Sequence, residues 1–223
     1  MSAGQGGAAS SFTDLMASLV AVFVLLFVVA QNNRGAGIDE TRAILIKQLR
    51  GELQRAGIDS AAVDSVPNDP NTVVVIFPDS VLFERGKSEM SEGGRRVVRN
   101  STPGLTRVMC VDSLRSRLDQ VVVEGHTDNT VPFGMDRQTG RRFNLRLSQL
   151  RSMDYVATST TALTTDDRAL SCYLNLVSAS GRGQEDSIPG LAADAAGQRR
   201  VVLRIRLRTE VRDTLRVPPA TQR

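Results

Sequence analysis

The strongest constraint on this chain is an acidic residue, Asp14, near the start of its longest apolar stretch, residues 12–30. With a helical rise of about 1.5 Å per residue, about 20 apolar residues span the hydrocarbon core of a membrane. A carboxylate inside such a span costs about 2.5–3.5 kcal/mol on insertion scales, so it usually faces a partner helix or an ion pathway. We therefore predict one transmembrane helix over residues 12–31, with Asp14 as the candidate ion-carrying residue.

The flanks of this stretch favour an uncleaved anchor over a signal peptide. A signal peptide begins with basic residues, whereas residues 1–14 contain one acid and no base. Within the stretch, Ala17, Ser18 and Ala21 fall on the same helical face as Asp14, where small side chains let two helices approach closely. This pattern favours a packed, functional helix, and the alternative is a plain anchor.

The composition of the remaining chain bounds its partners. All 28 Lys and Arg residues lie from residue 34 onward, an excess of positive charge that suits an anionic neighbour such as a cell-wall polymer, a lipid surface or nucleic acid. With no Trp and few other aromatic residues, the chain has no stacking platform for single strands, so we expect no direct nucleic-acid binding. One His and two Cys without ligand spacing predict neither a metal site nor a cofactor.

The two cysteines, Cys110 and Cys172, leave two interpretations open. In an oxidising compartment they could form a disulfide, and in a reducing one they would be small buried apolar residues.

Along the chain, the pattern predicts a disordered N-terminus over residues 1–11 and a linker region over 32–71. Within that region, residues 38–56 read as an amphipathic helix that ends before Gly57 and could pair as a short coiled coil or lie on a membrane. An α/β domain follows over residues 72–209, and a flexible tail over 210–223. In the α/β domain we predict strands at 72–77, 81–83, 120–124, 174–179 and 199–208, and helices at 89–100, 111–118 and 144–158.

Four motifs occur in this domain in one order. They are GHTDN at residues 125–129, NLRLSQLR at 144–151, GRG at 181–183 and RRV at 199–201. In this order they resemble the OmpA-like peptidoglycan-binding domain over residues 73–208. The resemblance implies an α+β sandwich fold and a non-enzymatic role.

The resemblance also implies a ligand and a site. The family binds the diaminopimelate stem of peptidoglycan, which carries an ammonium and a carboxylate on one carbon chain. Asp128 would take the ammonium, and Arg151 would take the carboxylate with its planar fork of donors. The alternative, purely structural roles are a turn residue for Asp128 and a surface ion pair for Arg151. We expect His126 to be structural. The other implied peptidoglycan-binding residues are Thr127, Phe143, Asn144 and Leu147.

The segment TDLMAS at residues 13–18, followed by an apolar run, resembles the anchor of MotB-type stator subunits. Among these, the short N-terminus and residues 143–151 resemble the ZorB subunits of Zorya anti-phage systems. The resemblance implies a homodimer surrounded by a pentamer of a multi-span A subunit, driven by protons or sodium ions. It places the N-terminus in the cytoplasm and the C-terminal domain in the periplasm of a bacterial inner-membrane protein. The alternatives are a flagellar-type stator, a non-conducting wall tether and a cell-wall hydrolase.

Overall fold

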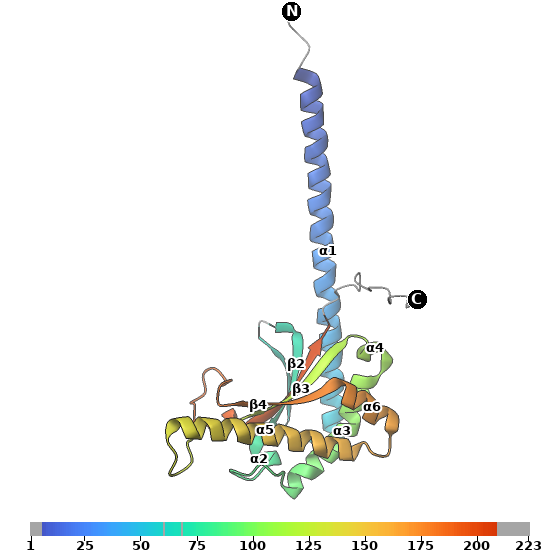
Figure 1. The fold of residues 1–223 in the computed structure, drawn as a ribbon. Helices are drawn as coiled ribbons and strands as arrows, with labels where there is room; N and C mark the ends of the chain where they lie inside the picture. Colours follow the sequence, from blue (N-terminus) through green and yellow to red (C-terminus); the bar gives the residue numbers. More distant parts are fainter. Residues whose placement is uncertain (1–5, 60, 68, 209–223) are drawn as a thin grey trace, which may run out of the picture. The chain divides into compact units, whose positions relative to one another are not determined.

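The computed structural model describes the backbone of residues 6–59, 61–67 and 69–208, and the side chains of 13–29, 38–59, 61–67 and 69–208. The chain divides into two compact units, Met1–Glu40 and Thr41–Arg223. Helix α1 (Gly6–Arg55) contributes to both of them (Figure 1). Residues 6–11, expected to be disordered, form the start of this helix, whereas residues 1–5 and the predicted tail at 210–223 lie outside the described residues.

In the first unit, residues 13–29 are helical and their side chains are exposed. The hydroxyl of Ser18 donates a hydrogen bond to the carbonyl of Leu15 one turn earlier (2.8 Å). No helix among the described residues combines the length and hydropathy that crossing a membrane requires.

The C-terminal part of α1 belongs to the core of the second unit. Its apolar stripe, formed by Leu45, Leu49 and Leu53, is buried within a single chain. The expectation that residues 38–56 pair as a coiled coil or lie on a membrane through this stripe is therefore wrong. An amphipathic helix buries its apolar stripe against another apolar surface, and here that surface belongs to the chain's own domain. The helix ends as predicted, since Gly57 adopts a positive φ of 69° just beyond its last turn.

The second unit contains one five-stranded sheet in the order β1-β2-β5-β3-β4. Strands β3 and β4 run parallel to each other, and the other neighbouring pairs are antiparallel. The valine-rich runs of the sequence form the central strands, as β-branched residues favour a pleated, buried surface. The strands are β1 (Ala62–Val66), β2 (Asp69–Pro78), β3 (Leu118–His126), β4 (Val177–Gly183) and β5 (Arg200–Leu207).

Helices complete a mixed α/β fold, which confirms the predicted class. Helix α5 packs on β3 and β4, and α3 packs on α5 and α6 (Figure 1). The helices of this unit after α1 are α2 (Asp79–Leu82), α3 (Glu92–Cys110), α4 (Asp112–Arg115), α5 (Arg137–Ala162), α6 (Asp167–Leu176) and the 3-10 helix η1 (Ala196–Gln198).

Several predicted boundaries differ from the structure. Residues 60–71, predicted as a linker, contain β1 and the start of β2, which form a hairpin. Helix α5 begins seven residues before the predicted start at 144, because the side chain of Asp136 caps it by accepting from the Thr139 amide (2.9 Å). Residues 81–83, predicted as a strand, form the end of α2 and an isolated bridge from Phe83 to Met90.

Two glycines of the motifs let α5 approach the sheet. A Cβ atom on Gly125 would lie 2.1 Å from the carbonyl oxygen of Ser148, and one on Gly181 would lie 2.5 Å from the amide nitrogen of Gln149. The helix side chains then bond the strand that they cover, since Ser148 Oγ accepts from the Gly183 amide (2.9 Å) and Gln149 Oε1 from the Gly181 amide (2.6 Å). These two motif glycines therefore allow the short distance between α5 and the sheet.

The cysteines form a disulfide. It joins Cys110, the last residue of α3, to Cys172 of α6, with Cα atoms 6.2 Å apart. Of the two possibilities that the sequence left open, the structure contains the bonded pair.

Candidate functional site

The candidate site lies at one edge of the sheet, where three strands end or begin. The register pairs Pro78 of β2 and His126 of β3 with the same residue of β5, Arg200. The residue after β2, Asp79, the loop after β3 with Asp128, and the residue before β5, Arg199, therefore meet at this edge. Helix α5 adds Asn144 and Arg151, which are two turns apart on one face.

Each of the three guanidinium nitrogens of Arg151 contacts an oxygen atom of the protein. Its Nη1 lies 2.8 Å from the Asp79 carboxylate, its Nε donates to the Lys87 carbonyl at 2.8 Å, and its Nη2 donates to the Glu84 carbonyl at 3.5 Å. The guanidinium also lies over the Phe83 ring, 5.1 Å from the ring centroid. With 2% of its surface exposed, it is among the largest fully buried side chains. Burial lowers its pKa, and the charge of Asp79 opposes that shift.

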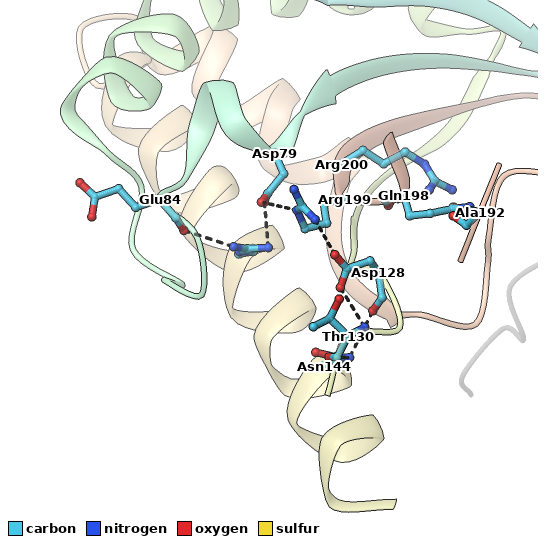
Figure 2. A network of polar contacts seen from close by, with 10 residues as sticks. Asp79, Glu84, Asp128, Thr130, Asn144, Ala192, Gln198, Arg199 and Arg200 are labelled. Atoms are coloured by element: carbon cyan, nitrogen blue, oxygen red, sulfur yellow. Dashed lines mark hydrogen bonds and ion pairs between the residues drawn. The ribbon is translucent and has the colours of Figure 1, made fainter. Parts of the chain in front are cut away.

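Asp128 contacts a second arginine. Its Oδ2 forms an ion pair and hydrogen bond with Arg199 Nη1, and its Oδ1 accepts from the Thr130 amide at 3.1 Å. Figure 2 shows this contact between Arg199 and Asp128, and a second one from Arg199 toward Asp79, where Nε and Oδ2 are 3.9 Å apart. Asp128 is buried, whereas 25% of the Arg199 side chain is exposed.

The site therefore holds two carboxylates and two guanidinium groups. They form a continuous row of ion pairs in the order Arg151, Asp79, Arg199 and Asp128. Burial raises the pKa of Asp79, and the charges of Arg151 and Arg199 oppose that shift. Because the four charges cancel, the site can bind a ligand of zero net charge without burying a net charge. A small zwitterion could do so by exchanging partners with the existing pairs.

Asn144 shapes the loop that carries Asp128. Its Nδ2 lies within hydrogen-bond distance of the carbonyls of Asp128 (3.2 Å) and Thr130 (3.1 Å) and of the Gln184 side chain (3.2 Å). It is buried, so its amide supports the loop. The backbone amide of Thr127 donates to the Gly183 carbonyl (2.8 Å), while its buried hydroxyl makes no hydrogen bond within the described part of the chain.

The remaining expected site residues lie on helices. Phe143 and Leu147 are partly exposed on α5, and Leu147 lies one turn before Arg151. Asp14 lies in the first unit, on α1, with an exposed side chain.

A neighbouring cluster of Glu124, His126 and Asp186 has residue types that can bind a metal ion, with one ligand atom of each within 4.8 Å of the others. The guanidinium of Arg204 already bridges both acids, at 3.0 Å from Glu124 Oε2 and 3.6 Å from Asp186 Oδ2. A divalent cation would have to displace it, and Arg200 adds further positive charge near Asp186 and His126. We interpret the cluster as structural, in line with the expectation for His126.

Two members of the charged site, Asp79 and Arg199, were not predicted from the sequence. A signal for Asp79 was present, as it is an acid directly after a buried strand. A signal for Arg199 was its place at the head of the RRV motif. Their proximity to Asp128 and Arg151 depends on strand order, which no local pattern encodes.

Comparison with known proteins supports the fold. No protein-family model and no curated protein matches the chain. A protein described as MotB-like from Desulfovibrio vulgaris has the same fold, with a TM-score of 0.55 and 20% identity over 78% of this chain and 96% of that chain. Weaker matches are the periplasmic domain of Helicobacter pylori MotB (TM-score 0.46, 14% identity, 67% and 80% covered) and the cell wall anchor of the type VI secretion system from Pseudomonas aeruginosa (0.46, 18%, 73% and 97%).

Proposed function

We propose that the second unit binds peptidoglycan at the site formed by Asp79, Asp128, Arg151 and Arg199. The observation that carries the proposal is the pair of linked ion pairs, Asp79–Arg151 and Asp128–Arg199, beside the GHTDN loop. The likeness to a MotB-like protein supports the same fold but not the ligand. The ligand class follows from the motif resemblance, which implies a diaminopimelate stem.

The chemistry of the site suits that ligand. The ammonium of the stem would lie on Asp128, and its carboxylate would meet the arginine pair, where planar forked donors recognise carboxylates well. Phe143 and Leu147 would line the carbon chain, and Thr127 offers a hydroxyl that makes no hydrogen bond within the described residues. Asn144 would act by holding the loop in place.

We further propose that the whole chain is the wall-anchored B subunit of an ion-driven motor in the bacterial inner membrane. Residues 12–31 would form the membrane anchor, with Asp14 carrying protons or sodium ions beside a pentamer of a multi-span A subunit. The apolar stretch around one acid supports this assignment. The defence role of Zorya-like systems rests on the sequence resemblance alone, and a flagellar-type stator is its alternative.

A homodimer in this proposal would form through the anchor. The face with Ala17, Ser18 and Ala21 remains available for close helix packing. The stripe of Leu45, Leu49 and Leu53 is not available for such packing, because each copy buries its own stripe within its own domain.

Binding to isolated sacculi tests the peptidoglycan proposal. The full chain in detergent should sediment with purified sacculi, and Asp128→Asn should reduce the bound fraction about tenfold, since a charge-assisted contact is lost. Asp119→Asn, at an exposed position of β3, is the matched control and should bind like the wild type. Equal binding by the Asp128 variant would reject the pocket, and release of muropeptides would favour a hydrolase.

Replacing Asp14 separates a motor from a static tether. If Asp14 carries the ion, Asp14→Asn abolishes ion flux and the activity of the complex while leaving binding to sacculi unchanged. Retained activity in this variant would instead support the non-conducting tether.

A further inference from the structure

We propose that an arginine cluster at the end of the sheet opposite the candidate site binds the phosphate groups of anionic phospholipids. The cluster consists of Arg115, Arg117, Arg206 and Arg208. The inference rests on the proposed membrane anchor. It gives the second unit a lipid-binding surface at one end and the proposed peptidoglycan site at the other.

The strand register separates the cluster from the candidate site. In β5, Arg200 lies at the candidate site, and Arg206 lies six residues further along the strand, which corresponds to about 20 Å. Arg206 pairs with Thr72 near the start of β2 and with Gln120 near the start of β3. Figure 1 shows α4, whose last residue is Arg115, at the end of the sheet remote from α2. The two surfaces can therefore bind separate partners at the same time.

Two guanidinium groups of the cluster converge on one carbonyl oxygen. Arg208 Nε donates to the Leu118 carbonyl at 2.9 Å, and Arg115 Nη1 donates to the same oxygen at 3.4 Å. The backbone fixes this arrangement, because the Arg117 carbonyl accepts from the Arg208 amide at 2.8 Å. Like charges this close repel each other, and a neutral carbonyl does not cancel them. An anion that bridges the two groups would remove the repulsion.

No carboxylate balances the four arginines, since none of them forms an ion pair within the described part of the chain. Arg204, one pleat earlier in β5, differs because it contacts both Glu124 and Asp186. Two described acids, Asp69 and Asp119, also lie at this end of the sheet, and the positive charge remains in excess. Arginine binds phosphate through two parallel N–H donors, so a phosphodiester suits this surface.

The short connection to the predicted anchor favours lipid phosphates over soluble ones. The Arg117 side chain donates to the hydroxyl of Thr41, so the chain enters the second unit beside the cluster. Nine residues, 32–40, separate Thr41 from the predicted membrane span. Even a fully extended chain of that length reaches at most about 32 Å, in any orientation of the two units. An anionic leaflet within this reach attracts each nearby arginine.

Arginine footprinting in nanodiscs tests this surface. The full-length chain is inserted into nanodiscs of phosphatidylcholine alone, or of phosphatidylcholine mixed with phosphatidylglycerol, and reacted with p-hydroxyphenylglyoxal, which modifies accessible guanidinium groups. Mass spectrometry should show Arg115, Arg117 and Arg208 reacting about fivefold more slowly in the anionic discs, the factor expected for one arginine at an anionic leaflet. Arg96, an exposed residue of α3, is the internal control and should react equally in both.

Substitutions separate the cluster from a general effect of anionic lipid. Replacing both Arg115→Gln and Arg208→Gln should abolish the slower reaction of Arg117, because the two converging groups are gone. Arg96→Gln is the matched control and should keep it. Arg115→Lys with Arg208→Lys keeps the charge without the planar fork, so it should keep part of the effect even if the Gln variant folds poorly. Circular dichroism reports the folded state of each variant.

A further arm distinguishes lipid phosphate from soluble phosphate. Inorganic phosphate added to discs of phosphatidylcholine alone should leave the reaction of Arg117 unchanged. An equal slowing by inorganic phosphate would overturn the assignment to lipid.

The outcomes also distinguish this inference from the proposed function. If the chain co-purifies with nanodiscs and binds sacculi, but Arg117 reacts equally in both kinds of disc or stays protected in the Gln variant, the lipid-binding surface is wrong and the proposed function stands. If the chain does not co-purify with nanodiscs, the proposed anchor is rejected, and the lipid-binding surface with it.

Discussion

The guanidinium of Arg151 lies 2.8 Å from the carboxylate of Asp79, and both side chains are shielded from solvent. The pair joins α5 to the first residue of α2, two elements that are distant in the sequence. Removing one partner of a buried ion pair leaves an uncompensated charge, which costs far more than the pair contributes. The contact therefore ties the stability of the domain to the geometry of the site.

Asp79→Ala should lower the free energy of unfolding by about 3–5 kcal/mol, because it leaves the Arg151 charge buried without its acid. Urea unfolding of the full chain in detergent, followed by circular dichroism, measures this change. Asp119→Ala, at an exposed position of β3, should change stability by no more than about 0.5 kcal/mol. Similar values for the two variants would show that the Asp79–Arg151 contact is not a buried pair in solution.

Gly125→Ala should destabilise the domain by about 1–3 kcal/mol or more, as expected when a methyl group is forced into a packed interface. The added Cβ would lie 2.1 Å from the backbone oxygen of Ser148, and backbone cannot move aside as a flexible side chain can. Gly93→Ala, on α3, is the matched control, since the atom nearest to its added Cβ, Ser91 Oγ, would be 3.8 Å away. Thermal unfolding should show a large drop in midpoint for the first variant and none for the second. An unchanged midpoint for Gly125→Ala would contradict the close approach of α5 to β3.

Much of the fold could be predicted from the sequence because the strand signals are strong. The run at 72–77 and the alternation at 199–208 both became strands of the sheet. The start of α5 was missed because the cap at Asp136 lies in a segment without apolar periodicity. The hairpin strand β1 was missed because Pro67 and Pro70 read as linker residues, although proline is tolerated at a strand start or turn.

The candidate site also contains some residues that the sequence predicts and others that it does not. Asn144 and Arg151 could be placed on one helical face from spacing alone. Their partners could not be predicted, because Asp79 and Arg199 reach the site through strand pairing across the sheet. The coiled-coil interpretation of residues 38–56 failed for a related reason, since an apolar stripe does not say which surface covers it.

Leu49 provides a test of that covered stripe. Leu49→Ala should cost about 2–5 kcal/mol in urea unfolding, as for a fully buried leucine replaced by alanine. Ile44→Ala, on an exposed part of the same helix, should stay within about 0.5 kcal/mol of the wild type. If the stripe instead joined two copies, the cost for Leu49→Ala would depend strongly on protein concentration, which the packing within one chain does not allow.

His126 should make the stability of the domain depend on pH. It is the single histidine of the chain, and neither ring nitrogen makes a hydrogen bond within the described residues. The charged groups around it are Glu124, Asp186, Arg200 and Arg204.

Burial lowers the pKa of His126 from 6.5, and the neighbouring Glu124 and Asp186 oppose the shift only in part. The unfolded chain therefore binds the proton more readily than the folded chain does. The free energy of unfolding should rise with pH across the interval from the lowered pKa up to 6.5, and this contribution is complete above 6.5. Urea unfolding at about pH 5 and about pH 7.5 measures the slope, and His126→Gln should remove it. The difference between the two proteins isolates the histidine, because the carboxylates titrate in both. A wild type that loses stability relative to His126→Gln as pH rises would show that the acids, and not burial, set the pKa of this residue.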